Sequence, residues 1–301
     1  VGPGTRNTAE TREMNDIVWG NYTKDELDRQ YDQSTLVPNT GELMEINAQD
    51  SARIRSELDC TQNISYGPTV MERLDIFPVA DKGAPVVIYH HGGAWTRSGK
   101  DQCSYIAPSF VAEGINVLVL DFALAPKVSL DEIVRQNRAA IAWAWHNADE
   151  YGWDRNRIHC LGHSSGGHIC GMMLVTDWVG DYGLPSDIIK SAAACSGMYE
   201  LEPVRLSHRN TYLDLTEQSA GRNSSIRQIP ANDIPLTVAW GTGELDEFQR
   251  QSREFAEAWA AAGHTVESFV LDGMHHFEVG REIVNPDYPV FPNILKNIRA
   301  S

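Results

Sequence analysis

The stretch IHCLGHSSGG, residues 158–167, decides the fold. Residues 158–161 are suited to a buried strand, residues 162–166 match the pattern G-x-S-x-G, and an apolar helical segment follows at 168–175. A serine in this position occupies a sharp strand-to-helix turn, which lifts its hydroxyl above the carboxyl edge of a sheet and over the positive end of a helix. We therefore expect Ser164 to be a nucleophile. The alternative is a glycine-rich helix start without chemistry.

Strand-like and helix-like segments alternate on both sides of this turn. The expected strands are 70–77, 85–89, 115–120, 158–161, 191–195, 236–240 and 266–271, and the expected helices include 130–147, 168–175 and 247–262. Strands separated by helices are typical of right-handed crossovers and a parallel sheet. The sequence therefore predicts an α/β fold: a mostly parallel twisted sheet with helices on both faces.

Two segments fall outside this alternation. Residues 1–65 are polar with short helical patches, and we expect them to form an N-terminal extension that packs on the core. Residues 66–301 then form the catalytic domain. The polar stretch at about 198–233 is long for a connection between two strands, so we expect a cap or lid insertion there.

The composition narrows the function classes. The chain of 301 residues has 25 Lys and Arg against 41 Asp and Glu, a net charge of −16, which disfavours nucleic acid and anionic membranes as partners. No apolar run approaches the roughly 20 residues of a membrane span. Five cysteines without a CxxC pair favour a reducing, cytoplasmic compartment over a disulfide scaffold, although secretion or a periplasmic location stays open because numbering begins at Val1. A homodimer is an expectation from the fold class alone.

A second glycine-rich motif, HGGAW at 91–95, follows the expected strand 85–89. Backbone amides aimed at a developing oxyanion lower the barrier to acyl transfer, and glycines let the backbone approach the substrate closely. We expect the amides of Gly92, Gly93 and Ala94, together with that of Ser165, to form an oxyanion hole. The alternative is a tight turn. Trp95 lies beside this loop and is a candidate for substrate binding, although such aromatic residues more often pack the core.

A serine nucleophile needs a base, and the base needs an acid that orients it. His275 and His276 follow the strand 266–271, whereas Glu244 and Asp246 follow the strand 236–240. The order serine, acid, histidine along the chain suits this sheet topology. Adjacent histidines without further ligands at a suitable spacing do not favour a metal site, so we expect neither a metal nor a cofactor.

Longer stretches carry a resemblance to a known family. The matching stretches are HGGAW at 91–95, DFALAP at 121–126, LDEIVRQNRAAIAW at 130–143, GHSSGGH at 162–168, EFQRQS at 247–252 and HHF at 275–277. The chain resembles α/β-hydrolases of the kynurenine formamidase (arylformamidase) type, which are relatives of hormone-sensitive-lipase-like esterases. The resemblance implies an α/β-hydrolase fold. It covers most of residues 70–280 and is loose over the first sixty residues.

The resemblance also selects among the candidate residues. The family's acid lies three residues after the glycine that ends the strand, which implies Glu244 with Asp246 as the fallback. Its histidine directly precedes a phenylalanine, which implies His276 rather than His275. It also supports Gly92 and Gly93 in the oxyanion hole.

These expectations combine into a metal-free serine hydrolase that cleaves a carboxylic ester or an aryl amide or formamide bond through an acyl-enzyme. The expected partner is a small, aromatic ester or amide. One alternative is a kynurenine formamidase acting on N-formylkynurenine. An alternative of another class is a catalytically silent binding protein with the same fold.

Overall fold

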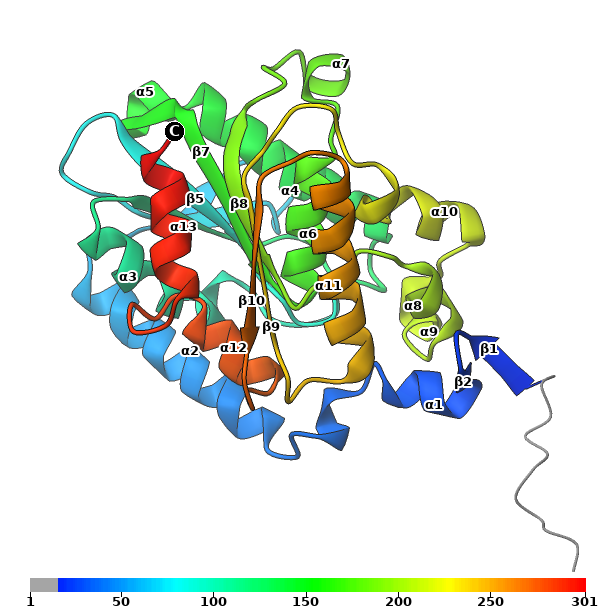
Figure 1. The fold of residues 1–301 in the computed structure, drawn as a ribbon. Coiled ribbons are helices and arrows are strands. Elements are labelled where there is room, and N and C mark those ends of the chain that lie inside the picture. Colours follow the sequence, from blue (N-terminus) through cyan, green and yellow to red (C-terminus); the bar gives the residue numbers. More distant parts are fainter. Residues whose placement is uncertain (1–15) are drawn as a thin grey trace, which may run out of the picture.

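The computed structural model describes residues 16–301, and an eight-stranded sheet lies at its centre (Figure 1). The strand order is β10-β9-β8-β7-β5-β6-β4-β3. Six strands run parallel: β5 (Ala84–His90), β6 (Asn116–Leu120), β7 (Trp153–His163), β8 (Ile189–Cys195), β9 (Leu236–Gly241) and β10 (Val266–Leu271). At one edge β4 (Arg73–Phe77) and β3 (Thr61–Ser65) pair antiparallel. The predicted, mostly parallel sheet is confirmed.

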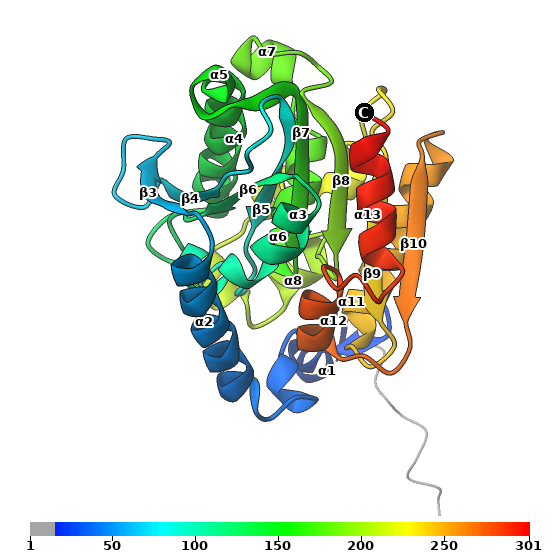
Figure 2. The same cartoon turned by 90° about the vertical axis from the view of Figure 1, so that its left-hand side faces the viewer.

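Helices cover both faces of the sheet (Figure 2). One face carries α4 (Leu130–His146), α6 (Ser165–Leu174) and α11 (Asp246–Ala261), and the other carries α2 (Thr40–Glu57), α3 (Ala107–Ala112), α12 (His276–Glu282) and α13 (Val290–Arg299). Successive side chains of a strand point to opposite faces. Accordingly Val86 and Ile88 of β5 belong to the first core, whereas Val87 and Tyr89 belong to the second. This strand is buried along its whole length, as its apolar run predicts.

The N-terminal part of the chain contributes one strand to the main sheet. Residues 1–15 lie outside the described residues, and a short hairpin, β1 (Ile17–Trp19) and β2 (Tyr22–Thr23), precedes α1 (Lys24–Arg29). The strand β3 lies within the expected extension, yet its Ser65 pairs with Arg73 in the main sheet. A boundary at residue 65 therefore separates an edge strand from its sheet. The strand TQNIS is polar and mostly exposed, so it lacks the apolar run that marks buried strands.

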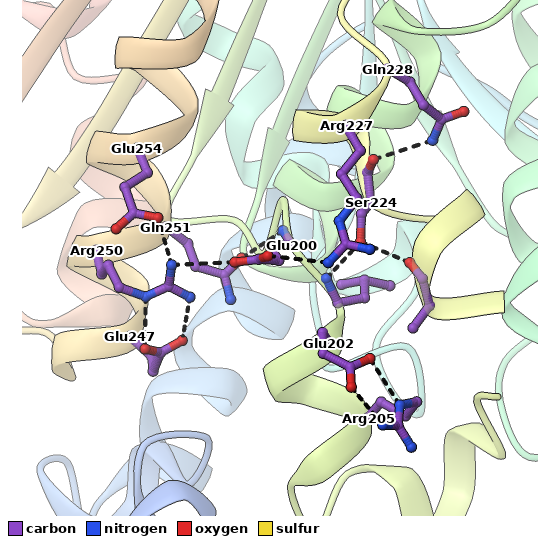
Figure 3. Close-up of polar contacts among 12 residues, drawn as sticks. Glu200, Glu202, Arg205, Ser224, Arg227, Gln228, Glu247, Arg250, Gln251 and Glu254 are labelled. Atoms are coloured by element: carbon purple, nitrogen blue, oxygen red, sulfur yellow. Dashed lines mark hydrogen bonds and ion pairs between the residues drawn. The ribbon is translucent and has the colours of Figure 1, made fainter. Parts of the chain in front are cut away.

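Helices fill the long connection between β8 and β9, in which the sequence predicts no strands. They are α8 (Glu202–Leu206), α9 (Asn210–Leu213) and α10 (Glu217–Arg222), followed by a 3₁₀ turn at Ser225–Arg227. Glu200, which precedes α8, forms ion pairs with Arg227 at 3.3 Å and with Arg250 of α11 at 3.4 Å (Figure 3). The insertion is thus tied to α11 and lies beside α1 (Figure 1).

The remaining α-helices are α5 (Ala148–Tyr151) and α7 (Trp178–Tyr182), and short 3₁₀ helices span Gln33–Thr35, Lys100–Gln102 and Ser104–Ile106. Within residues 16–301, no helix has both the length and the apolar character that crossing a bilayer requires.

Candidate active site

Ser164 occupies the turn between β7 and α6 in a strained backbone conformation. Its φ is 60° and its ψ is −127°, and its amide donates to the carbonyl oxygen of Cys195 at 3.0 Å. A side chain is excluded at both neighbouring glycines, because a Cβ on Gly162 would overlap the carbonyl oxygen of Gly166, and one on Gly166 would overlap that of His90. A non-glycine residue at positive φ persists only where its surroundings enforce it. Here the close packing of strand ends enforces it.

Three side chains from three strand ends meet at this turn. The Nε2 atom of His276 lies 2.8 Å from the Ser164 hydroxyl oxygen, and its Nδ1 atom lies 2.7 Å from Oε2 of Glu244. Ser164, His276 and Glu244 are 8%, 3% and 4% exposed. With Nδ1 donating to the carboxylate, Nε2 is free to accept the serine proton. The arrangement has the geometry of an activated nucleophile.

The second oxygen of Glu244 is held by two donors. Its Oε1 atom accepts from the Ser196 hydroxyl at 2.6 Å and from the Gly241 amide at 2.8 Å. Because both donors bind Oε1 while His276 contacts Oε2, they fix which oxygen faces the imidazole. Sequence reasoning missed Ser196, although its place directly after β8, beside the strand that leads to Ser164, is a usable signal.

The fallback residues lie outside this chain of hydrogen bonds. Asp246 is exposed in the first turn of α11. His275 caps α12: its Nδ1 accepts the amide of Glu278 at 3.2 Å, and its side chain is 28% exposed. The structure therefore brings together the acid and the base that the resemblance implies.

Uncharged rings flank the imidazole of His276. The His163 ring lies 4.5 Å from it and the Phe248 ring 4.7 Å from it, measured between centroids. Burial, together with the nearby His276, holds the pKa of His163 well below its ordinary value. His163 is therefore neutral at pH 7, and Glu244 is the charged group that binds the imidazole of His276.

The glycine-rich loop faces the nucleophile. Gly92 packs so closely that a Cβ there would lie 3.2 Å from Cβ of Ser164, and Gly93 and Ala94 adopt φ values of 106° and 54°. The amides of Gly93 and Ala94 have no acceptor among the described residues. That of Ser165 opens α6, where amides have no intrahelical acceptor. Free amides beside a nucleophile can bind an oxyanion.

Two neighbouring contacts fix this loop. The ring of His91 stacks on Phe122 at 4.0 Å, and its Nδ1 lies 2.7 Å from the carbonyl oxygen of Gly92. The Ser165 hydroxyl accepts the amide of Trp95 at 3.3 Å. The side chain at position 165 thus has a structural role beyond that of its backbone amide.

The structure corrects the prediction for Trp95. Its side chain is 1% exposed, and its indole N–H donates to Nδ1 of His168 at 3.2 Å, while Nε2 of His168 lies 2.9 Å from the carbonyl oxygen of Asn223. Trp95 is not among the residues that line the cavity at Ser164. Its apolar ring is buried between the loop and α6, where its indole N–H has a hydrogen-bond acceptor.

A cavity of about 100 Å³ opens onto Ser164 and His276. Its lining residues include three aromatic residues, Tyr89, Tyr105 and Phe277. The rest is formed by Gln33, Met44, Asn47, Gly92, Gly93, Ala94, Arg97, Ser98, Gln102, Cys103, His163 and Arg209. The N-terminal segment and the insertion supply Gln33, Met44, Asn47 and Arg209, which sequence reasoning missed because only tertiary packing brings them here.

No group of three or more His, Cys, Asp or Glu side chains within residues 16–301 is arranged to hold a metal ion.

Comparisons with known proteins agree with this geometry. A BD-FAE family model matches residues 74–192. The chain is 31% identical to a kynurenine formamidase of Danio rerio, over 94% of this chain and 99% of that protein. It is 27% identical to the esterase LipC of Mycobacterium tuberculosis, over 71% of this chain and 59% of that protein.

Solved structures show the same fold. A putative thioesterase from Silicibacter sp. TM1040 superposes with a TM-score of 0.79 at 24% identity, covering 90% of this chain and 99% of that one. A Pyrobaculum calidifontis esterase superposes with a TM-score of 0.69 at 17% identity, covering 88% and 92%. With a relative at this identity over almost its whole length, the chain belongs to the kynurenine formamidase-type family of α/β-hydrolases.

Proposed function

We propose that Ser164, His276 and Glu244 are the catalytic triad of a serine hydrolase that cleaves a carboxylic ester or an aryl amide bond. The observation that carries the proposal is the unbroken chain of hydrogen bonds from Glu244 through His276 to Ser164, at 2.7 and 2.8 Å, at the wall of a cavity. The names of the relatives, formamidase and esterase, agree with this reaction class.

The reaction follows from the positions of these atoms. The Ser164 oxygen attacks the substrate carbonyl while Nε2 of His276 accepts its proton, and Glu244 stabilises the imidazolium. Amides among Gly92, Gly93, Ala94 and Ser165 bind the oxyanion. The imidazolium then protonates the leaving alcohol or amine, and a water, deprotonated by His276, hydrolyses the acyl-enzyme.

Substrate choice follows from the walls of the cavity. The rings of Tyr89, Tyr105 and Phe277 favour an aryl group. In this proposal, the insertion at about 198–233 acts as a cap, because it contributes Arg209 to the wall. N-formylkynurenine is the second candidate substrate, since the Danio rerio relative that matches along its whole length is named kynurenine formamidase.

A fluorophosphonate probe tests the nucleophile, and turnover tests the substrate. We expect the probe to label the protein at Ser164, and Ser164→Ala to abolish labelling and lower kcat by on the order of 10⁴-fold or more. We expect His276→Ala to lose labelling and kcat in the same way. Its matched control, His275→Ala, should retain both the labelling and the kcat of the unmodified protein. A value of kcat/KM for N-formylkynurenine several decades above that for phenyl acetate would assign the formamidase activity. Absence of labelling in the unmodified protein would refute the proposal and favour a binding protein.

A further inference from the structure

Arg209, in the insertion, is a buried cation without an acidic partner. It is 4% exposed, and its Nε and Nη2 atoms donate to the carbonyl oxygen of Tyr31 at 3.2 and 2.8 Å, while Nη1 lies 3.1 Å from the sulfur of Met198. No carboxylate among residues 16–301 forms an ion pair with it. Burial lowers its pKa, and Arg97 adds to this effect. The guanidinium carbon lies 5.3 Å from the ring centroid of Tyr31 and 5.7 Å from that of Phe248. These cation–π contacts offset part of the cost of burying the charge, and an anion would offset more of it.

Other arginines of the insertion and of α11 are paired with carboxylates. In Figure 3, Arg205 pairs with Glu202 at 2.5 Å, and Arg250 pairs with Glu247 at 2.8 Å. Further along the chain, Arg222 pairs with Asp131 at 2.6 Å. In an acidic protein with carboxylates on neighbouring elements, Arg209 differs from these arginines by facing the cavity at Ser164 instead.

Two further groups face the same region with unused polar atoms. Arg97, on the loop after the glycine-rich motif, lines the cavity, and its guanidinium has no hydrogen bond or ion pair among the described residues. Gln33 is 8% exposed, and neither its amide nitrogen nor its amide oxygen has a hydrogen-bond partner.

The cavity at Ser164 has no Asp or Glu among its lining residues, although the chain as a whole carries a charge of −16. Gln33, Arg97 and Arg209 also line an adjoining hollow, and so stand where the two spaces meet. Asp32 is the one carboxylate lining that hollow, and its Oδ1 accepts from the amide and hydroxyl of Ser34. These hydrogen bonds lower the pKa of Asp32, and the charges of His208 and Arg209 add to the effect, although Asp32 forms no ion pair with Arg209.

We infer that the substrate carries a carboxylate, bound by Arg209 and Arg97 with Gln33 as a further hydrogen-bond donor, at the boundary between the cavity and the hollow. This inference rests on the proposed function and specifies its substrate class: esters or amides with an anionic group on either the leaving group or the acyl group. Arginine suits this role because its planar guanidinium can hold a carboxylate through two parallel hydrogen bonds.

Two pairs of substrates of equal size test the inference. The first pair, 3-acetoxybenzoate and 3-acetoxybenzamide, places the charge on the leaving group. The second, monophenyl succinate and phenyl succinamate, places it on the acyl group. We expect kcat/KM for the charged member of at least one pair to exceed that of its amide about tenfold or more, mainly through KM. Whichever pair shows the preference identifies the side of the scissile bond that carries the charge.

Variants then locate the recognition. Arg209→Met and Arg97→Gln should each lower the charged-to-neutral ratio about tenfold, and Arg209→Lys should retain part of it. Because the ratio is measured within one variant, a partial loss of folded protein cancels. Arg97 is exposed, so its replacement also tests the inference without a change in the core. Arg155→Gln, at the far end of β7 and paired with Asp149, is the matched control and leaves the ratio unchanged.

Binding of the reaction products separates the two proposals. Calorimetry with 3-hydroxybenzoate and 3-hydroxybenzamide measures charge selectivity without turnover, and Ser164→Ala can be measured in the same way. If no substrate is hydrolysed but the benzoate binds about tenfold more tightly than the benzamide, the proposed reaction fails and the anion site stands. Equal constants within both substrate pairs and for the two products, or a ratio unchanged in both arginine variants, would overturn the inference.

Discussion

Replacing Glu244 by Gln changes one atom of the triad and tests its hydrogen bonding directly. The Ser196 hydroxyl at 2.6 Å and the Gly241 amide at 2.8 Å both donate to Oε1. A glutamine side chain therefore places its oxygen there and turns its NH₂ group toward Nδ1 of His276. The imidazole must then accept at Nδ1 and carry its proton on Nε2, so it can no longer take the proton of Ser164.

A wrong tautomer of this kind costs a serine triad on the order of 10⁴-fold in kcat, or about 5 kcal/mol of transition-state stabilisation. We expect a loss of this size in the hydrolysis of phenyl acetate at pH 7, with a melting temperature close to that of the unmodified protein. Nitrogen-15 NMR of the histidine ring should show the proton at Nδ1 in the unmodified protein and at Nε2 in Glu244→Gln.

Asp246→Asn is the matched control, because Asp246 is exposed and the carboxylate bonded to His276 is that of Glu244. It should change kcat less than about threefold. The reasoning is refuted if Glu244→Gln keeps more than about a tenth of the activity, or if Asp246→Asn loses as much as Glu244→Gln.

Three further outcomes follow from the same contacts. Ser196→Ala removes one charge-assisted hydrogen bond to Glu244, so kcat should fall several-fold, and an unchanged kcat would show that the Gly241 amide suffices. Gly166→Ala places a Cβ against the carbonyl of His90 and should lower the unfolding free energy by about 3 kcal/mol or more in urea titrations. Its control is Gly41→Ala, in the first turn of α2 with open space around it, which should leave the unfolding free energy unchanged or raise it. Burial lowers the pKa of three histidines from 6.5 to about 4: His90, His91 and His168. Between pH 6.5 and about 4, these histidines bind protons in the unfolded chain but not in the folded one. The free energy of unfolding should therefore fall with falling pH by roughly 1.4 kcal/mol per pH unit for each of them. A urea midpoint that stays constant from pH 6.5 to 5 would contradict this.

The buried strands and the nucleophile turn are features that local pattern can predict. The apolar run at 85–89 became β5 (Ala84–His90), and the G-x-S-x-G stretch lies between β7 and α6 as expected. Local pattern alone left two acids and two histidines open. The family resemblance selected Glu244 and His276, and their hydrogen bonds agree with that choice.

Other features depend on contacts that no local pattern encodes. The edge strand β3 is polar and is defined by pairing with β4. Trp95 satisfies its indole on His168, a residue 73 positions away. Gln33 and Arg209 reach the cavity only because the N-terminal segment and the insertion pack together. The place of Trp95 beside the glycine-rich loop predicts a substrate contact, but Trp95 does not line this cavity.

The bond between Arg209 and the carbonyl of Tyr31 joins parts of the chain 178 residues apart. In the proposed reaction, the bond is broken at strand-end turns where an added Cβ would overlap backbone atoms, whereas the inferred anion site draws Gln33 and Arg209 from peripheral segments. These two tasks can therefore diverge independently. Related hydrolases can therefore differ in these outer segments and in the small molecules that they select, and still keep the same catalytic residues.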